Sequence, residues 1–103
     1  MFIRIEKMYL KISNKTKPTR KRPTRFLKIK LSNCVFNNEG YINCYIKDFT
    51  IRPHRHRPIT LDIHIQGNTD LKNGVVSINA FCNVKRNSEV NVTASSYELM
   101  FIK

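Results

Sequence analysis

A run of eight residues near the middle of the chain alternates without a fault between apolar and polar side chains. Within residues 59–66 the apolar members share one parity: Ile59, Leu61, Ile63 and Ile65. A strand places every second side chain on one face, so this segment predicts a β-strand with one dry face. A second alternating run covers 75–84. The residues between the two runs include the turn formers Asn68, Asp70, Asn73 and Gly74. Together these features predict a β-hairpin.

Four further segments have strand character, and three of them change parity part of the way along. These segments are 2–12, with a slip between Ile5 and Met8; 26–31; 41–51, with a slip that predicts a β-bulge near Lys47 and Asp48; and 90–101, with a change around Ser95 and Ser96. No segment has helical periodicity. About six strands in 103 residues predict one domain over 1–103, an all-β antiparallel sandwich of the immunoglobulin-like kind.

Basic residues are concentrated toward the front of the chain, which carries a formal net charge of +12. Between Lys7 and Asn38 there are ten Lys or Arg residues and no acid. Residues 13–25 combine this charge with two prolines and no apolar anchor, so we expect a basic flexible loop or arm there. Such a charge favours nucleic acid, heparin-like glycans or anionic membrane surfaces as partners. The expected anion-binding residues are Lys17, Arg20, Lys21, Arg22, Arg25, Arg52, Arg55 and Arg57.

Catalytic and metal-binding patterns are not found in the sequence. His54 and His56 would project to one side of an extended segment, but the arginines around them would repel a cation, so we expect a solvent-facing basic loop at 52–58. There is no Gly-rich phosphate loop and no closely spaced carboxylate pair. We therefore expect a protein that is not an enzyme, with no metal site and no cofactor.

The aromatic side chains do not form one alternating stripe with Lys or Arg along any strand. A sheet that binds single-stranded nucleic acid stacks bases on exposed rings among basic residues. We therefore expect most of the aromatics to lie in the core. The residues concerned are Phe26, Phe36, Tyr41, Tyr45, Phe49, Phe81, Tyr97 and Phe101.

Cysteines and targeting signals leave the location of the protein open. Cys34, Cys44 and Cys82 are an odd number, so they cannot all pair within the chain, and the sequence does not assign a partner to any of them. Residues 1–12 lack the apolar core of a signal peptide, and no run reaches membrane-spanning length, which predicts a cytoplasmic or nuclear protein without a transmembrane segment. The glycosylation patterns at Asn14 and Asn91 favour secretion instead.

Residues 26–84 resemble the front half of an ML-type lipid-recognition domain, the family of the ganglioside activator and related secreted insect proteins. The resemblance rests on the order of four segments: Ser32-Asn33-Cys34 after a strand, 46–53 (IKDFTIRP), 58–63 (PITLDI), and Gly67-Asn68-Thr69 before the strand 75–84. It implies a secreted protein that holds an apolar ligand between two splayed sheets and catalyses no reaction. This chain would then be a shortened or incomplete member, in which Cys34 has lost its usual late partner, and secretion would require that its N-terminus is incomplete.

The first expectation for function is therefore binding of an apolar or lipidic small molecule between the sheets, with the basic segments favouring anionic head groups. The expected ligand-binding residues are Leu27, Ile29, Ile42, Ile46, Leu61, Ile63, Ile65, Val76 and Ile78. The same residues could also close on one another as a packed core. The alternatives are a small basic nucleic-acid-binding β domain and an interaction module that docks a partner on an unpaired edge strand.

Overall fold

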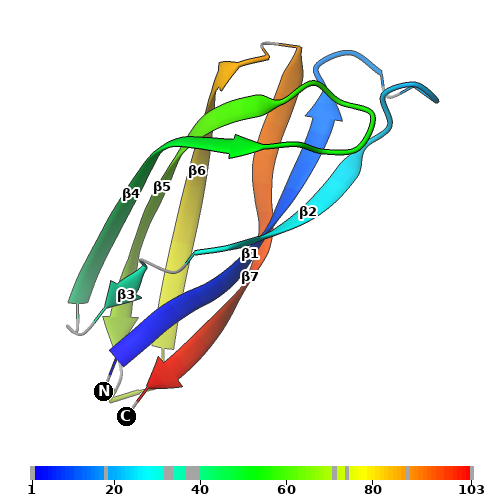
Figure 1. The fold of residues 1–103 in the computed structure, drawn as a ribbon. Coiled ribbons are helices and arrows are strands. Elements are labelled where there is room, and N and C mark those ends of the chain that lie inside the picture. Colours follow the sequence, from blue (N-terminus) through cyan, green and yellow to red (C-terminus); the bar gives the residue numbers. More distant parts are fainter. Residues whose placement is uncertain are drawn as a thin grey trace.

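The computed structural model describes residues 2–17, 19–31, 34–36, 40–70, 72–73, 75–87 and 89–102. Every helix or strand assigned in these ranges is a strand, and there are seven (Figure 1): β1 (Phe2–Asn14), β2 (Arg25–Lys30), β3 (Val35–Phe36), β4 (Gly40–Ile51), β5 (Ile59–Asp70), β6 (Val75–Arg86) and β7 (Val90–Ile102). The prediction of an all-β protein is confirmed.

The strands form two antiparallel sheets that face each other. In the first sheet, β1 pairs with β7 along one side and with β2 and then β3 along the other. The second sheet has the order β4-β5-β6. The chain therefore crosses between the sheets twice, from β3 to β4 and from β6 to β7 (Figure 1). The result is an elongated β-sandwich with extents of 47 × 21 × 18 Å.

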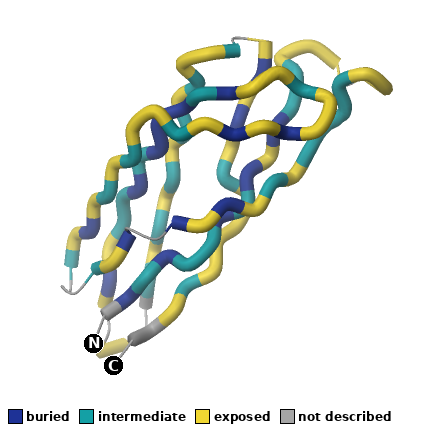
Figure 2. Tube along the Cα trace, in the orientation of Figure 1, coloured by how far each residue is buried: buried dark blue, intermediate teal, exposed yellow. Residues whose placement is uncertain are grey.

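The core lies between the sheets, and buried residues alternate with exposed ones along the strands (Figure 2). β5 is the central strand of its sheet, and its inward residues Leu61, Ile63 and Ile65 are fully buried. They pack against inward residues of β1 such as Met8, Leu10 and Ile12. The dry face predicted from the alternation of 59–66 is confirmed.

Each change of parity in the sequence corresponds to an irregularity in strand pairing. In β4 the register with β5 shifts between Ile46 and Phe49, and Asp48 has a φ of 55°, which confirms the predicted bulge. In β1 the register with β7 shifts between Ile5 and Lys7. In β7, Ser96 and Ala94 pair with the consecutive β1 residues Tyr9 and Leu10, so Ser95 between them has no partner in the register. A bulge adds one residue to one strand, so it reverses the parity of the residues that follow.

The extent of the central hairpin and the number of strands differ from the prediction. β5 continues through Gly67 and Asn68 to Asp70, because these residues pair with Ile78, Ser77 and Val75 of β6. The ladder with β6 thus outweighs their turn propensity. The predicted turn formers Asn68 and Asp70 lie in the strand, and Gly74 lies outside the described residues. The seventh strand, β3, has only two residues, too few to give a periodic signal.

The expectation that most aromatics lie in the core was wrong. Five of the eight are exposed: Phe26, Tyr41, Tyr45, Phe81 and Tyr97. Phe36 and Phe49 pack against the core, and the side chain of Phe101 lies outside the described ones. The reason is the pleat, because residues such as Tyr45 and Phe81 have the parity opposite to the buried aliphatic residues of their strands. Tyr45, His64 and Phe81 also face one another across three strands, so an aromatic row on this outer face is visible only once the strands are aligned.

Candidate functional site

The two basic segments of the chain meet at one end of the sandwich. The guanidinium of Arg55, in the loop between β4 and β5, donates a 3.0 Å hydrogen bond to the backbone oxygen of Arg20, in the loop between β1 and β2. Nε2 of His56 lies 2.7 Å from the backbone oxygen of Pro23. Residues 52–58 therefore form a turn that packs on the other basic loop rather than an extended segment. His54 is exposed and His56 is half-buried, so the expectation of a solvent-facing loop holds only in part.

Polar contacts join described residues of the segment 13–25, which the sequence predicts to be a basic flexible loop or arm, to the rest of the fold. Ser13 and Asn14 complete β1, and Arg25 begins β2. Between them the backbone N–H of Lys15 donates a 2.8 Å hydrogen bond to the backbone oxygen of Glu89, and the guanidinium of Arg22 forms an ion pair with the Glu89 carboxylate. Backbone and ionic contacts thus replace the apolar anchor that the sequence lacks.

The eight expected anion-binding residues all belong to these two loops or to their borders. Six are exposed, and Arg22 and Arg25 are half-buried. Glu89, directly before β7, forms an ion pair with Arg22. This set, together with Lys15, is called the basic end below: Lys15, Lys17, Arg20, Lys21, Arg22, Arg25, Arg52, Arg55 and Arg57.

The outer face of β1 and β2 extends the positive charge along the sandwich. Three cross-strand pairs follow one another on this face: Lys7 with Lys30, Tyr9 with Lys28, and Lys11 with Phe26. The ring of Phe26 is 67% exposed. The phenol of Tyr9 donates a 2.8 Å hydrogen bond to Glu98, and this contact raises the pKa of Tyr9. This four-lysine surface with its two rings is called the hairpin face below.

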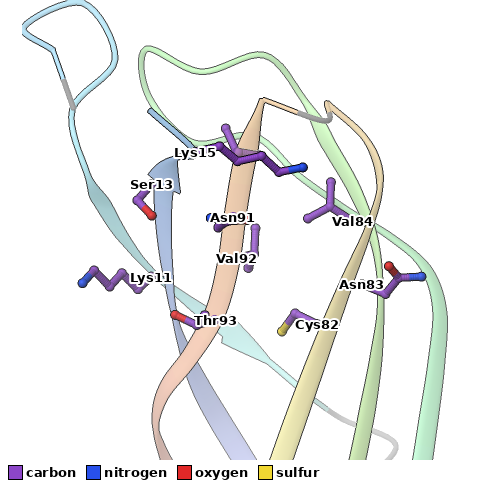
Figure 3. A pocket seen from close by; sticks show the side chains of 10 residues that line it. Lys11, Ser13, Lys15, Cys82, Asn83, Val84, Asn91, Val92 and Thr93 are labelled. Carbon is purple, nitrogen blue, oxygen red and sulfur yellow. The ribbon is translucent and has the colours of Figure 1, made fainter. Parts of the chain in front are cut away.

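A groove of about 540 Å³ lies where β6 meets β7, next to the basic end (Figure 3). In the described part of the chain, β6 pairs with β5 and β7 pairs with β1, and no pairing joins β6 to β7. The groove is lined by Lys11, Ser13, Lys15, Cys82, Asn83, Val84, Val90, Asn91, Val92 and Thr93. Figure 3 shows Val92 and Cys82 facing each other across it, with Lys15 crossing its upper end. The seam between the sheets is thus open here. Its lining combines an apolar strip of Cys82, Val84, Val90 and Val92 with polar side chains, and Lys11 and Lys15 are among the latter.

Two smaller grooves connect the seam to the loops of the basic end. The first, of about 360 Å³, is lined by residues of the loop 15–24 and shares Lys15 with the seam groove. It shares Glu89 with the second small groove. The second, of about 400 Å³, is lined by Arg57, Pro58, Asn87 and Glu89. Lys15 and Glu89 therefore connect three adjoining grooves. Basic side chains line each of them: Lys11 and Lys15 in the seam groove, Arg22 in the first small groove and Arg57 in the second small groove.

Burial raises the pKa of the Cys82 thiol to about 11. At neutral pH this thiol is therefore uncharged, and it behaves as a small apolar side chain in the groove wall.

The nine expected ligand-binding residues have the inward parity of their strands, but none of them lines these grooves. Ile29, Ile42, Leu61, Ile63 and Ile65 are buried. Leu27, Ile46, Val76 and Ile78 are partly exposed at the margins of the core. No sequence pattern points to the residues of the seam groove, because they come together only where β6 and β7 are unpaired neighbours.

Among the described residues, no group of three or more His, Cys, Asp or Glu side chains is arranged to hold a metal ion. The same part of the chain has no helix of the length and hydropathy needed to cross a membrane. Comparison of the chain with family models, with curated proteins and with solved structures gave no match.

Proposed function

We propose that this protein binds an anionic lipid without chemical conversion, with the head group at Lys11 and Lys15 and the apolar part along the seam between β6 and β7. The observation that carries the proposal is that Lys15 of the basic end lines the same groove as the apolar strip of Cys82, Val84, Val90 and Val92. The groove of about 540 Å³ is within the range of small-molecule sites.

The inner face of β6 supports an apolar contact at the seam. Its inward residues Ile78, Ala80, Cys82 and Val84 are all partly exposed, whereas Ile59, Leu61, Ile63 and Ile65 of neighbouring β5 are fully buried. Cys82 and Val84 line the seam groove, and Ile78 and Ala80 continue the row beyond it. β6 is an edge strand, and sheet packing covers it less completely. A hydrocarbon chain laid against this row would remove apolar surface from water, which is worth roughly 25 cal/mol for each Å² buried.

The charge around the groove supports an anionic rather than a neutral head group. Lys11 and Lys15 belong to the run of ten basic residues that contains no acid. Each Lys or Arg near an anionic lipid surface contributes about 1 kcal/mol to binding. The basic end and the hairpin face would thus attract the protein to acidic membranes, where its ligand resides.

This proposal keeps the lipid ligand that the resemblance to ML-type domains implies, but it moves the ligand from the interior to the seam. This choice is supported by the buried residues of β1 and β5, which pack in one cluster between the sheets and include the expected ligand-binding residues Leu61, Ile63 and Ile65. Secretion and membership of that family remain proposals that accompany lipid binding.

The test is binding to phosphatidylserine vesicles and uptake of a fluorescent fatty acid. The double variant Lys11→Gln/Lys15→Gln removes two charges at the groove, and we expect affinity for the vesicles to fall roughly 30-fold, the equivalent of about 2 kcal/mol. The matched control is Lys47→Gln/Lys72→Gln, which removes an exposed lysine of β4 and another of the turn between β5 and β6, and should bind like the wild type. Equal losses in both variants, or no fatty-acid uptake by the wild type, would reject the proposal.

A second candidate is binding of single-stranded nucleic acid, which the hairpin face favours. Phe26 is exposed and surrounded by Lys11 and Lys28, an arrangement that suits stacking of a base and contact with phosphate. For this function, Phe26→Ala should weaken binding of an oligonucleotide, and affinity should fall steeply with salt. Fatty-acid uptake should not change with the Phe26→Ala substitution or with the salt concentration.

A further inference from the structure

We propose that Cys34 and Cys44 form a disulfide bond that joins the two sheets on the side opposite the seam groove. Their sulfur atoms lie 2.6 Å apart. That separation is about 0.6 Å more than an S–S bond of about 2.05 Å, so the bond needs only a small adjustment. This inference does not depend on the proposed function.

The backbone around both cysteines belongs to the two sheets. The backbone oxygen of Cys34 accepts a 3.0 Å hydrogen bond from Ile5 of β1, so Cys34 is fixed to the edge of the first sheet. Cys44 lies on the inward face of β4, where it pairs with Ile65. In the described residues no strand pairing joins β3 to β4. A bond between these cysteines would therefore be the covalent link across that side of the sandwich.

Cys82 is the cysteine that remains unpaired. It lies on β6, which is separated from β4 by the central strand β5. Two strand spacings amount to about 9.6 Å, which is beyond the reach of a disulfide. The odd number of cysteines is then explained by one pair, of which Cys34 is buried and Cys44 is partly buried, and by one thiol in the wall of the seam groove.

The oxidant we name is a small-molecule disulfide such as oxidised glutathione. One cysteine thiolate attacks this disulfide and releases the first glutathione thiolate. The second cysteine then attacks the mixed disulfide and releases the other. The two protein sulfurs lose two electrons, the glutathione disulfide gains them, and the two protons pass to the two released thiolates.

The burial of Cys34 determines at which stage of folding this exchange occurs. The side chain of Cys34 is fully buried, and its burial, together with contact to Cys44, raises its pKa far above the ordinary value. The folded protein thus offers little thiolate at this position, so the bond should form while the two sheets are still coming together. A stable bond of this kind is typical of an oxidising compartment.

The experiment is thiol labelling of the whole chain after refolding in a glutathione redox buffer. The refolded protein is denatured, treated with N-ethylmaleimide with or without prior reduction, and examined by intact mass and peptide mapping. Without reduction we expect one label, on Cys82, and a linked peptide pair that contains Cys34 and Cys44. After reduction all three cysteines should be labelled.

Two variants separate the bond from other outcomes. Cys82→Ser should take no label before reduction and two after it. Cys44→Ser should leave Cys34 and Cys82 both reactive in the denatured chain, an outcome that can be read even if this variant folds poorly. Three labels on the unreduced wild type, or a linked pair that includes Cys82, would overturn the inference.

Discussion

The carboxylate of Asp62 accepts a 3.0 Å hydrogen bond from the backbone N–H of Asp48. Asp62 stands on the outer face of β5, yet it is only 9% exposed, and Asp48 is part of the β4 bulge with a φ of 55°. The phenol of Tyr45 donates to the other carboxylate oxygen at 3.4 Å, and the ammonium of Lys85 lies 4.0 Å away. One carboxylate on the central strand therefore holds the irregular backbone of its neighbour.

The first prediction concerns this bulge. Asp62→Ala should lower the free energy of unfolding by about 1.5–3 kcal/mol, because it removes a charge-assisted hydrogen bond and leaves the N–H of Asp48 without its partner. Urea unfolding measures the effect. Asn79→Ala, an exposed change on the outer face of β6, should stay within about 0.5 kcal/mol of the wild type. A similar value for Asp62→Ala would show that the bulge does not need this carboxylate.

The second prediction concerns the pH dependence of the Asp48–Lys85 pair, whose atoms Oδ1 and Nζ lie 2.6 Å apart. The hydrogen bond and the charge of Lys85 lower the pKa of Asp48 below its ordinary value of 3.8. Its contribution to stability is therefore present above that value and is lost as the pH falls through the lower folded-state pKa. Asp48 also raises the pKa of Lys85, so that contribution is lost as the pH rises beyond the ordinary 10.5.

Asp48→Asn tests this pair while keeping a residue that tolerates a positive φ. The wild type should melt at a slightly higher temperature than the variant between pH 5 and 9, since an exposed pair contributes little. This difference should shrink below about pH 3.8 and again above about pH 10.5. A difference that stays constant from pH 2 to pH 11 would rule out the pair as its source.

The third prediction concerns the close approach of β5 and β6 at Gly67. A Cβ added there would lie 2.0 Å from the backbone oxygen of Ser77, too close for the strands to keep their spacing. We expect Gly67→Ala to destabilise the protein by at least about 1–3 kcal/mol, the usual cost of overpacking. Thermal melting measures this change. Asn68→Ala, which alters the adjacent exposed residue of the same ladder, should have a much smaller effect.

The sequence predicts the class of fold well because period-2 alternation survives in each long strand. Even the three changes of parity were informative, since each coincides with an irregularity of pairing. The end of β5 was predicted too early because Gly67, Asn68 and Asp70 have turn chemistry, and only their partners on β6 hold them in the ladder.

The site was harder to predict, because its residues are brought together by the order of strands in space. The basic residues of loops 13–25 and 52–58 could be selected by charge alone, but their contact, through Arg55 and the backbone of Arg20, depends on the fold. The seam groove likewise requires β6 and β7 to be unpaired neighbours. The Cys34–Cys44 contact depends on the crossing from β3 to β4, which no spacing rule encodes.

The last prediction separates a ligand at the seam from a ligand in the interior. Val84 lines the seam groove, and Val84→Thr keeps its shape while replacing an apolar methyl group with a hydroxyl, so fatty-acid affinity should fall about fivefold. Ile63 is fully buried between the sheets, and Ile63→Val should cost about 0.5–1.5 kcal/mol of stability without changing that affinity. Fluorescence titration and urea unfolding of the same samples measure both quantities. If Ile63→Val weakened uptake and Val84→Thr did not, the ligand would lie in the interior, where the sequence pattern first predicted it.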